Sequence, residues 1–301
     1  MVVTSKIIHN IKTLRLLITD RCPYRCFYCH REGMKEIFPE LLNVADYRYF
    51  MNLLKNHFGL KEVILSGGDP CCRSDIWEIV KSIKETGLFS IIITKGMLLD
   101  KLGAVNQITF TIDTLDKNLY SKITGVEGEN LKKTVFKLIE AKSKGVKIVI
   151  NTPISRNIND DRKNFEELLS FCQKHKVDEW KLIEEMNTHK KIYREDLYLE
   201  KYAQKMGIIK RLKRINGYKL SLNHHGVLIT LYRCHCHAVK LLKRYIQESL
   251  FLDPAGNILL CMRNNRKVKL TDLIKKKNTG SIIETINNID FEKICPIIKS
   301  K

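Results

Sequence analysis

The sequence contains no apolar run of the length that a membrane-spanning helix needs, and no segment repeats at a fixed period. Residues 1–12 carry Lys6 and Lys12 but lack the continuous apolar stretch of a secretory signal. Acidic residues are also scarce, with 33 Asp and Glu against 53 Lys and Arg. These absences argue against a membrane partner and against secretion, and they predict a cytoplasmic protein.

The resulting net charge of +20 favours anionic partners. The lysines are scattered, however, and the densest short run, residues 275–277, lacks the interleaved aromatic side chains of single-strand binders. We therefore interpret most of this charge as a solvated surface and do not expect nucleic acid as a partner. Among anionic partners, we therefore favour a small-molecule substrate over nucleic acid.

Ten cysteines are present, and three of them form a C-x3-C-x2-C triplet. Cys22, Cys26 and Cys29 follow directly after the apolar segment 14–18. In a reducing compartment such clustered thiols indicate metal ligation rather than disulfides. Three thiolates on one tight loop can ligate three irons of a cubane cluster and leave the fourth iron open, because such clusters normally take four cysteines. The alternative is a structural zinc loop, which usually pairs C-x2-C units and needs a fourth ligand close by.

Residues 14–186 alternate short apolar strands with amphipathic helices, which is the pattern of a parallel sheet covered by helices. A chain of 301 residues can hold this pattern as one large domain with a smaller addition. The predicted strands are Leu14–Thr19, Val63–Ser66, Ser90–Thr94, Ile108–Ile112, Lys147–Asn151 and Trp180–Ile183. The predicted helices include Val44–Phe58, Ser74–Thr86, Leu131–Lys144 and Asp161–His175.

A polar motif follows each predicted strand, at the end where parallel barrels build their active sites. The cysteine triplet follows the first strand, and Ser-Gly-Gly-Asp-Pro at residues 66–70 follows the second. The remaining motifs are Thr94-Lys95-Gly96, Thr111-Ile112-Asp113-Thr114, Asn151-Thr152-Pro153 and Glu184-Glu185-Met186. We therefore expect one functional site at this edge of the sheet.

The cysteine loop, with the aromatic Tyr28 before its last cysteine, resembles the cluster-binding motif of the radical S-adenosylmethionine (SAM) superfamily. The resemblance implies a [4Fe-4S] cluster held by the three cysteines. It also implies that SAM is chelated by the open iron and reductively cleaved to a 5′-deoxyadenosyl radical, so that the cofactor supplies the chemistry and the protein orients it.

The resemblance also implies which residues contact SAM. Gly67, Gly68 and Asp69 resemble the Gly-Gly-Glu motif that receives the SAM ammonium group, with Asp69 in place of the glutamate. Glycines allow a close approach of the backbone, and a carboxylate accepts hydrogen bonds from a cation. The other implied contacts are Tyr28, Thr94, Thr111 and Asn151.

Residues 14–186 resemble more closely the GTP 3′,8-cyclase branch of that superfamily, the MoaA-like enzymes of molybdenum cofactor biosynthesis. The stretches that carry this resemblance are Leu14–Cys22, Thr111–Asp116, Lys122–Gly125, Asn157–Asp161 and Ile183–Met186. The implied fold class is α/β, a partial (β/α)6 TIM-like barrel of the radical SAM type over residues 10–190. A small C-terminal α+β domain is expected over residues 191–301.

The basic residues that bind triphosphate in that branch are only partly present. Arg15 and Lys181 occupy two such positions, and we expect them to contact an anionic substrate in the catalytic site. Ile64 and Val149 stand where the branch has an arginine and a lysine, and neither can make charge-assisted contacts to phosphate. Nearby lysines that could replace them are Lys61, Lys95 and Lys147.

The same branch carries a second cluster in its C-terminal part. The matching cysteines of this chain are Cys234, Cys236 and Cys261, although the C-x-C spacing is atypical. The resemblance therefore implies a second [4Fe-4S] cluster, and a zinc site built from Cys and His is the alternative. Candidates for a fourth ligand are His235, His237 and Cys295.

Three hypotheses for function follow. The first is a MoaA-like radical SAM lyase that cyclises or rearranges a nucleotide or another small anionic substrate, with electrons from a donor such as flavodoxin or ferredoxin. The second is a peptide-modifying radical SAM maturase, because such enzymes also add auxiliary clusters to this barrel. The third is a zinc-containing regulator that binds nucleic acid, which would leave the order of the strand-end motifs unexplained.

Overall fold

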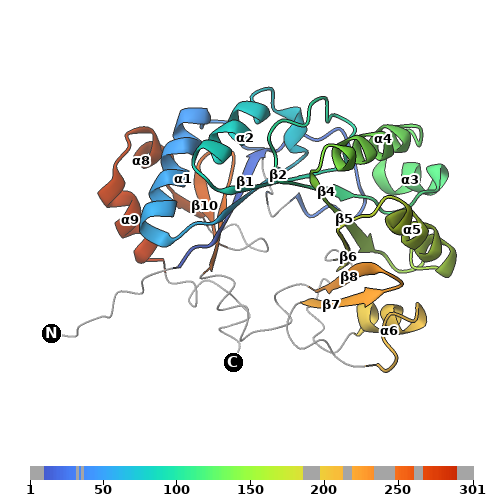
Figure 1. Ribbon diagram of the computed structural model, residues 1–301. Coiled ribbons are helices and arrows are strands. Elements are labelled where there is room, and N and C mark those ends of the chain that lie inside the picture. The colour runs from blue at the N-terminus through green and yellow to red at the C-terminus, as the bar shows by residue number, and fades with distance from the viewer. Residues whose placement is uncertain are drawn as a thin grey trace.

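The structure is a computed structural model that describes residues 10–31, 34, 37–185, 197–212, 219–233, 248–260 and 267–289. Its strands form one curved sheet in the order β11-β10-β9-β1-β2-β3-β4-β5-β6-β8-β7. The sheet bends into an open arc, with helices on its convex side (Figure 1). The architecture is therefore α/β with a partial barrel that is not closed.

The centre of the sheet consists of parallel strands that neighbour one another in chain order. They are β1 (Thr13–Thr19), β2 (Glu62–Gly67), β3 (Phe89–Thr94), β4 (Gln107–Thr111), β5 (Lys147–Ile154) and β6 (Glu179–Glu184). All of the predicted strands are thus confirmed, with ends that differ by a few residues. Because these strands are parallel, their carboxyl ends meet at one edge of the sheet.

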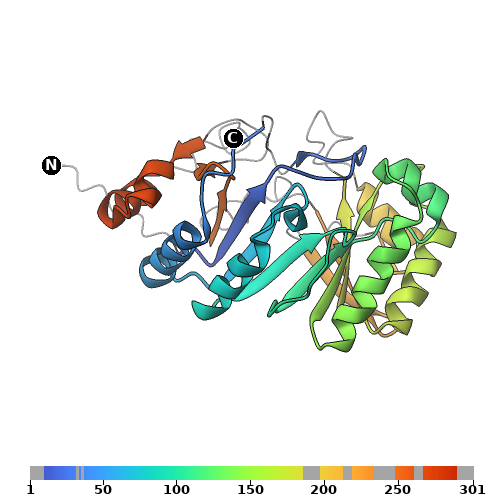
Figure 2. The same ribbon diagram turned by 90° about the horizontal axis from the view of Figure 1, so that it is seen from above.

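The helices in the connections pack against the convex face of this sheet (Figure 2). They are α1 (Val44–Phe58), α2 (Ile76–Glu85), α3 (Lys117–Thr124), α4 (Asn130–Ser143) and α5 (Arg162–Lys174). The bounds of α1 match the prediction because both ends carry strong signals. Asn43 and Asp46 form a capping box at its start, and Gly59 ends it in the left-handed conformation with a φ of 78°.

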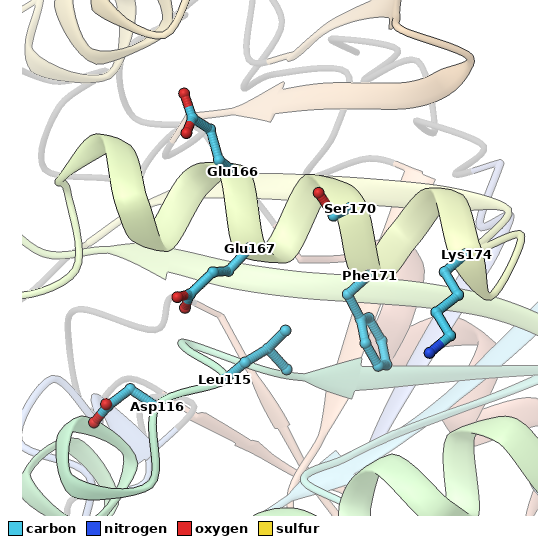
Figure 3. Close-up of a pocket in the computed structure, with 7 residues that line it drawn as sticks. All are labelled: Leu115, Asp116, Glu166, Glu167, Ser170, Phe171 and Lys174. Carbon is cyan, nitrogen blue, oxygen red and sulfur yellow. The ribbon is translucent and has the colours of Figure 1, made fainter.

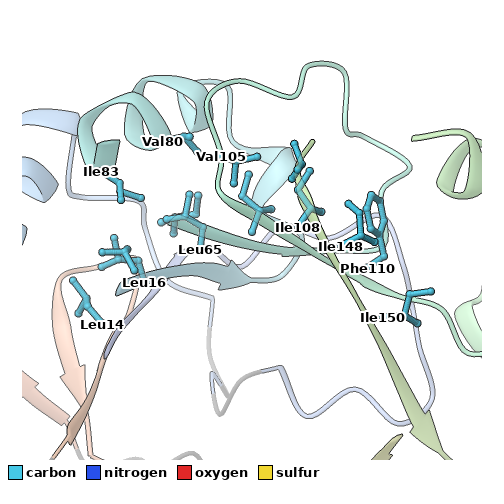
Figure 4. Packing of buried hydrophobic residues seen from close by; sticks show 14 of the residues in the cluster. Leu14, Leu16, Leu65, Val80, Ile83, Val105, Ile108, Phe110, Ile148 and Ile150 are labelled. Atoms are coloured by element: carbon cyan, nitrogen blue, oxygen red, sulfur yellow. The ribbon is translucent and has the colours of Figure 1, made fainter. Parts of the chain in front are cut away.

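The main hydrophobic core lies between the sheet and these helices (Figure 4). Leu14 and Leu16 of β1, and likewise Ile148 and Ile150 of β5, are fully buried there. Since side chains alternate between the two faces of a strand, the odd-numbered residues of β1 and β5 point to the concave face. This alternation places Arg15 and Asn151 on the side of the sheet that the helices do not cover.

Strands from the C-terminal third extend both edges of the parallel arc. They are β7 (Lys219–His224), β8 (Val227–Tyr232), β9 (Ser249–Leu252), β10 (Asn257–Leu259) and β11 (Lys267–Lys269). β8 pairs in parallel with β6, and β9 pairs in parallel with β1. The expected boundary at residue 190 lies outside the described residues, so the division into two domains stays a prediction.

In the described residues, three further helices accompany these strands. They are α6 (Tyr198–Lys205), α8 (Thr271–Lys275) and α9 (Thr279–Asn287). Within the described ranges, no helix combines the length and the apolar character that crossing a membrane requires.

Candidate active site

The cysteine loop follows β1 and is anchored by the end of α3. The amide of Arg25 donates to the carbonyl of Thr124 at 2.8 Å, and the amide of Phe27 donates to the carbonyl of Ile123 at 3.2 Å. Gly125 caps α3 with a φ of 68°, and a Cβ atom there would lie 3.1 Å from Cβ of Arg25. The Lys-Ile-Thr-Gly stretch noted in the sequence therefore holds the loop between its first and last cysteine.

The Gly-Gly pair after β2 holds the start of the same loop. The amide of Gly68 donates to the carbonyl of Thr19 at 2.8 Å, and the amide of Asp69 donates to that of Arg21 at 2.9 Å. A Cβ atom on Gly67 would lie 2.2 Å from the Thr19 carbonyl oxygen, and one on Gly68 would lie 2.2 Å from that of Arg21. Only glycine permits this approach. The motif thus has a structural role at the cysteine loop, in addition to the SAM contact that the sequence predicts.

The thiols of the triplet differ in exposure, since Cys22 and Cys29 are exposed and Cys26 is half-buried. Burial raises the pKa of the half-buried Cys26 thiol to about 12. A bound metal would reverse this effect, because ligation stabilises the thiolate. In the described part of the chain, no three His, Cys, Asp or Glu side chains converge on a single ion. The donor set fits a cluster in which each cysteine ligates a different iron.

Asp69 is buried, and its carboxylate already accepts several hydrogen bonds. The donors are the Thr94 hydroxyl at 2.8 Å and the amides of Cys71 and Lys95 at 3.0 and 3.3 Å. Burial raises the pKa of Asp69 above its ordinary value, although these hydrogen bonds oppose the rise. The structure thus brings two of the expected SAM contacts together as partners of each other, and the contact of either with SAM stays a prediction.

The ring of Tyr28 reaches a buried ion pair. Its hydroxyl donates to Oδ1 of Asp113 at 2.7 Å, while Nζ of Lys95 donates to Oδ2 of Asp113 at 2.6 Å and to the Tyr28 hydroxyl at 3.1 Å. Burial would lower the pKa of Lys95, but Asp113 raises it above its ordinary value, so the amine stays charged. The amine of Lys95 therefore already contacts Asp113 and Tyr28. The expected SAM contact of Tyr28 stays a prediction.

Thr111, Asn151 and Lys181 form one row across the concave face. The register of β4 and β5 pairs Thr111 with Asn151, and that of β5 and β6 pairs Asn151 with Lys181. Oδ1 of Asn151 is buried and has no hydrogen-bond partner among the described residues. A buried acceptor without a donor is unfavourable, so a ligand that donates a hydrogen bond would fit here. Lys181 also forms an ion pair with Glu179 at 3.5 Å.

Arg15 lies on the concave face of β1. One of its terminal nitrogens donates to the Ser66 hydroxyl at 3.2 Å, and its guanidinium lies over the ring of Phe251 at 6.0 Å. β1 and β6 are the first and last strands of the arc formed by β1 to β6. A ligand that contacts both Arg15 and Lys181 would therefore extend across the whole concave face.

β6 ends in two buried glutamates, as the Glu-Glu motif suggested. Glu184 lies 3.6 Å from Arg233, which also bonds to Glu200 at 2.8 Å. One carboxylate oxygen of Glu185 is buried without a hydrogen-bond partner in the ranges that the structure describes.

The expected ligands of a second cluster are Cys234, Cys236 and Cys261. All three fall outside the described residues, so the second cluster stays a prediction.

A surface hollow of about 620 Å³ lies elsewhere, along α5 and the residues that precede α3 (Figure 3). Asp116, which borders it, already caps α3 through the amide of Leu119 at 2.7 Å. None of the site residues discussed above lines this hollow, so we do not assign it to the active site. Its lining consists of Leu115, Asp116, Glu166, Glu167, Ser170, Phe171 and Lys174.

The profile of the radical SAM superfamily matches residues 16–172, which is more than half of the chain. The chain belongs to the radical SAM superfamily. Members of this superfamily use a [4Fe-4S] cluster together with SAM, as the cysteine triplet led us to expect. The membership speaks against the hypothesis of a zinc-containing regulator.

Among its relatives, this radical SAM protein is 31% identical over 169 residues to a probable GTP 3′,8-cyclase of Pyrobaculum aerophilum, which covers 54% of each chain. It is 32% identical over 183 residues to a protein of the same name from Methanococcus aeolicus, which covers 56% of this chain and 58% of the relative. The expected likeness to the cyclase branch is confirmed. The chain spans about half the length of the curated relatives it matches.

Solved structures confirm the fold. Streptococcus suis SuiB bound to SAM has a TM-score of 0.65 at 16% identity, covering 96% of this chain and 72% of that one. The protein anSMEcpe with bound AdoMet has a TM-score of 0.58 at 10% identity, covering 95% of this chain and 86% of that one. At these identities the likeness concerns the fold alone.

Sequence reasoning missed the contact between Lys95 and Asp113. Both residues were visible in strand-end motifs, but nothing in the linear sequence pairs the end of β3 with the end of β4. It also missed that Arg233, after β8, joins Glu184 and Glu200. Finding that contact required knowing that β8 lies beside β6.

Proposed function

We propose that this radical SAM protein holds its catalytic [4Fe-4S] cluster through Cys22, Cys26 and Cys29 and binds SAM along the adjoining strand ends. The observation that carries the proposal is the row of Thr111, Asn151 and Lys181 on the concave face, which starts at the carboxyl end of β4 and continues across β5 and β6. The unpartnered Oδ1 of Asn151 supports a ligand with an N–H or O–H donor at this place.

The proposed reaction is hydrogen abstraction from a small anionic substrate. When bound, the reduced cluster and SAM supply a 5′-deoxyadenosyl radical. The chain's own contribution is to orient SAM through Thr111 and Asn151 and to hold the substrate against it. Arg15 and Lys181 are the proposed anion contacts, because arginine and lysine side chains can make charge-assisted hydrogen bonds to phosphate or carboxylate groups.

A nucleotide is the substrate class that we favour, with cyclisation or rearrangement as the outcome. The names of the relatives and the net charge of +20 support this choice. We further propose a second cluster ligated by Cys234, Cys236 and Cys261, and a flavodoxin or ferredoxin as the electron donor. A peptide substrate is the competing outcome of the experiments below.

The first experiment measures the cofactors on anaerobically reconstituted protein. The triple variant Cys22→Ala/Cys26→Ala/Cys29→Ala should lose about four irons per chain and all 5′-deoxyadenosine formation under reductant. The matched control is Cys172→Ala, which removes a buried thiol of α5 and should retain both. Zinc in place of iron, or 5′-deoxyadenosine formed by the triple variant, would contradict the proposal.

The second experiment separates the substrate classes. Wild type is incubated with SAM and reductant, in turn with GTP, other nucleotides and short peptides, and products are identified by mass spectrometry. Arg15→Met and Lys181→Met should each raise the KM for a nucleotide about tenfold or more, because a charge-assisted contact to phosphate is lost. Lys163→Met on α5, where the lysine side chain is 81% exposed, is the control and should leave KM unchanged. Turnover of a peptide without any nucleotide turnover would favour the maturase hypothesis.

A further inference from the structure

Tyr28, Lys95 and Asp113 come from three separate segments and meet in one hydrogen-bonded group, which we call the Tyr-Lys-Asp group. Both carboxylate oxygens of Asp113 are used, one by the Tyr28 hydroxyl at 2.7 Å and the other by the Lys95 amine at 2.6 Å. The side chain of Lys95 is 9% exposed and that of Asp113 is fully buried. A buried ion pair of this kind is retained only with good geometry, because both charges have been removed from water.

The backbones of the two charged residues are themselves fixed by neighbouring elements. The backbone carbonyl of Asp113 accepts from the side-chain amides of Asn159 and Asn164, both at 3.1 Å. The carbonyl of Lys95 accepts from the hydroxyl of Thr134 in α4 at 2.6 Å. These hydrogen bonds connect the ion pair to α4 and to the start of α5, so the pair is held rigidly in place.

The cysteine loop contacts this ion pair through the hydroxyl of Tyr28. Tyr28 stands between Cys26 and Cys29, and the amide of Cys29 donates to the carbonyl of Cys26 at 3.0 Å. Fixing the ring of Tyr28 therefore fixes the turn on which these two thiols are carried.

We infer that Lys95 and Asp113 are positioning residues, which act through Tyr28 to set the separation of Cys26 and Cys29 before any iron is bound. The inference rests on the proposed function, because it takes these cysteines as cluster ligands. It assigns to the Tyr-Lys-Asp group a preorganising role, in which the apo loop already holds its ligands near the productive geometry. In this arrangement the hydroxyl of Tyr28 serves the loop rather than SAM.

The test uses two variants. Tyr28→Phe removes only the hydroxyl. Tyr28→Phe/Lys95→Met/Asp113→Leu replaces the whole group with apolar side chains, so that no buried charge is left without its partner. The control is Lys12→Met/Glu248→Gln, which removes a 2.9 Å ion pair that joins the residues preceding β1 and β9, at the opposite end of these strands. Circular dichroism during heating shows whether each protein is folded.

The first readout needs no metal. Apo protein is treated briefly with iodoacetamide, and the labelling rates of Cys26 and Cys29 are determined by peptide mass spectrometry. In folded Tyr28→Phe, Cys26 should react about tenfold faster than in wild type, because the loop opens more often when a hydrogen bond to a charged group is lost. The control variant should match wild type. Unchanged labelling in both folded test variants would overturn the inference.

The second readout uses the loaded protein. Iron per chain should fall in both test variants, and the EPR spectrum of the reduced cluster should broaden and change its response to SAM. A purely structural role would lower the unfolding temperature while leaving the spectrum of the loaded fraction unchanged, and that result would also overturn the inference. If wild type itself loads no iron, the proposed function fails, whereas the difference in apo labelling still decides whether the Tyr-Lys-Asp group orders the loop. If the apolar variant does not fold, Tyr28→Phe alone decides.

Discussion

The guanidinium of Arg73 donates to the backbone carbonyl of Ile18 at 3.0 Å, which joins the turn after β2 to the last residues of β1. The same side chain donates to the carbonyl of Leu42 at 2.7 Å and forms an ion pair with Asp75 at 2.6 Å. Arg73 is 6% exposed, and Ile18 and Leu42 are 0% and 1% exposed, so both carbonyls are shielded from bulk water. One arginine therefore fastens the strand from which the cysteine loop starts.

Replacing this arginine should cost stability. Arg73→Met leaves two buried carbonyls and one carboxylate without their donor, and we expect the free energy of unfolding to fall by about 3 kcal/mol. Urea denaturation of the apo protein measures it. Lys163→Met, at a lysine whose side chain is 81% exposed, should change it by less than about 0.5 kcal/mol. Equal stability of the two variants would show that the hydrogen bonds of Arg73 do not stabilise the end of β1.

A second prediction concerns the close approach at Gly68. Gly68→Ala places a Cβ atom 2.2 Å from the carbonyl oxygen of Arg21, so the loop must move, at a cost of about 3 kcal/mol. Iron content after reconstitution should drop with it. Gly280→Ala is the control, because its Cβ atom would meet nothing within 4 Å, and in α9 it should gain about 0.5–1 kcal/mol. Full iron loading of Gly68→Ala would contradict the proposed support of the loop.

A third prediction follows from the raised pKa of Asp69. Because burial raises the folded pKa above the unfolded value of 3.8, the folded state binds this proton more readily than the unfolded state does. The contribution of this protonated carboxyl to the stability of the folded protein is therefore complete below the unfolded pKa and is lost as the pH rises through the folded pKa. Relative to Asp69→Asn, wild type should become less stable as the pH rises above the unfolded pKa of 3.8. Urea midpoints of both apo proteins test this, and a gain of wild type over the variant with rising pH would have the wrong sign.

A fourth prediction tests the unpartnered oxygen of Asn151. Asn151→Leu keeps the number and branching of the non-hydrogen side-chain atoms and removes the acceptor, so the folded protein should lose little or no stability, since no described donor is left unpaired. SAM affinity of the loaded protein, measured by equilibrium dialysis, should fall about tenfold. Asn118→Leu, on the exposed side of α3, should bind SAM as wild type does. Unaltered SAM binding by Asn151→Leu would remove this residue from the site.

The strands β1 to β6 were predictable because each is a short apolar run followed by a polar motif, and such runs are typical of parallel sheets. The cysteine loop was predictable from its spacing. The row of Thr111, Asn151 and Lys181 was not, because strand register depends on pairing between segments distant in the sequence. The Tyr-Lys-Asp group could not be predicted from the sequence for the same reason.

The C-terminal strands illustrate the same limit. β10 and β11 are very short, and β7 alternates half-buried and exposed residues without the apolar run that marks the central strands. They join the sheet through β8 and β9, which pair with the two edges of the arc, and the sequence pattern of these strands does not specify that pairing. Only the assembled sheet shows where they belong.

The pairing of β9 with β1 has a consequence for biosynthesis. Lys12 and Glu248, which join the residues before these strands, are 236 positions apart in the sequence. The first strand therefore emerges from the ribosome long before its outer neighbour exists, and until then it presents an unpaired edge. We expect the arc to fold late, with the slow kinetics that are typical of pairing between strands distant in the sequence.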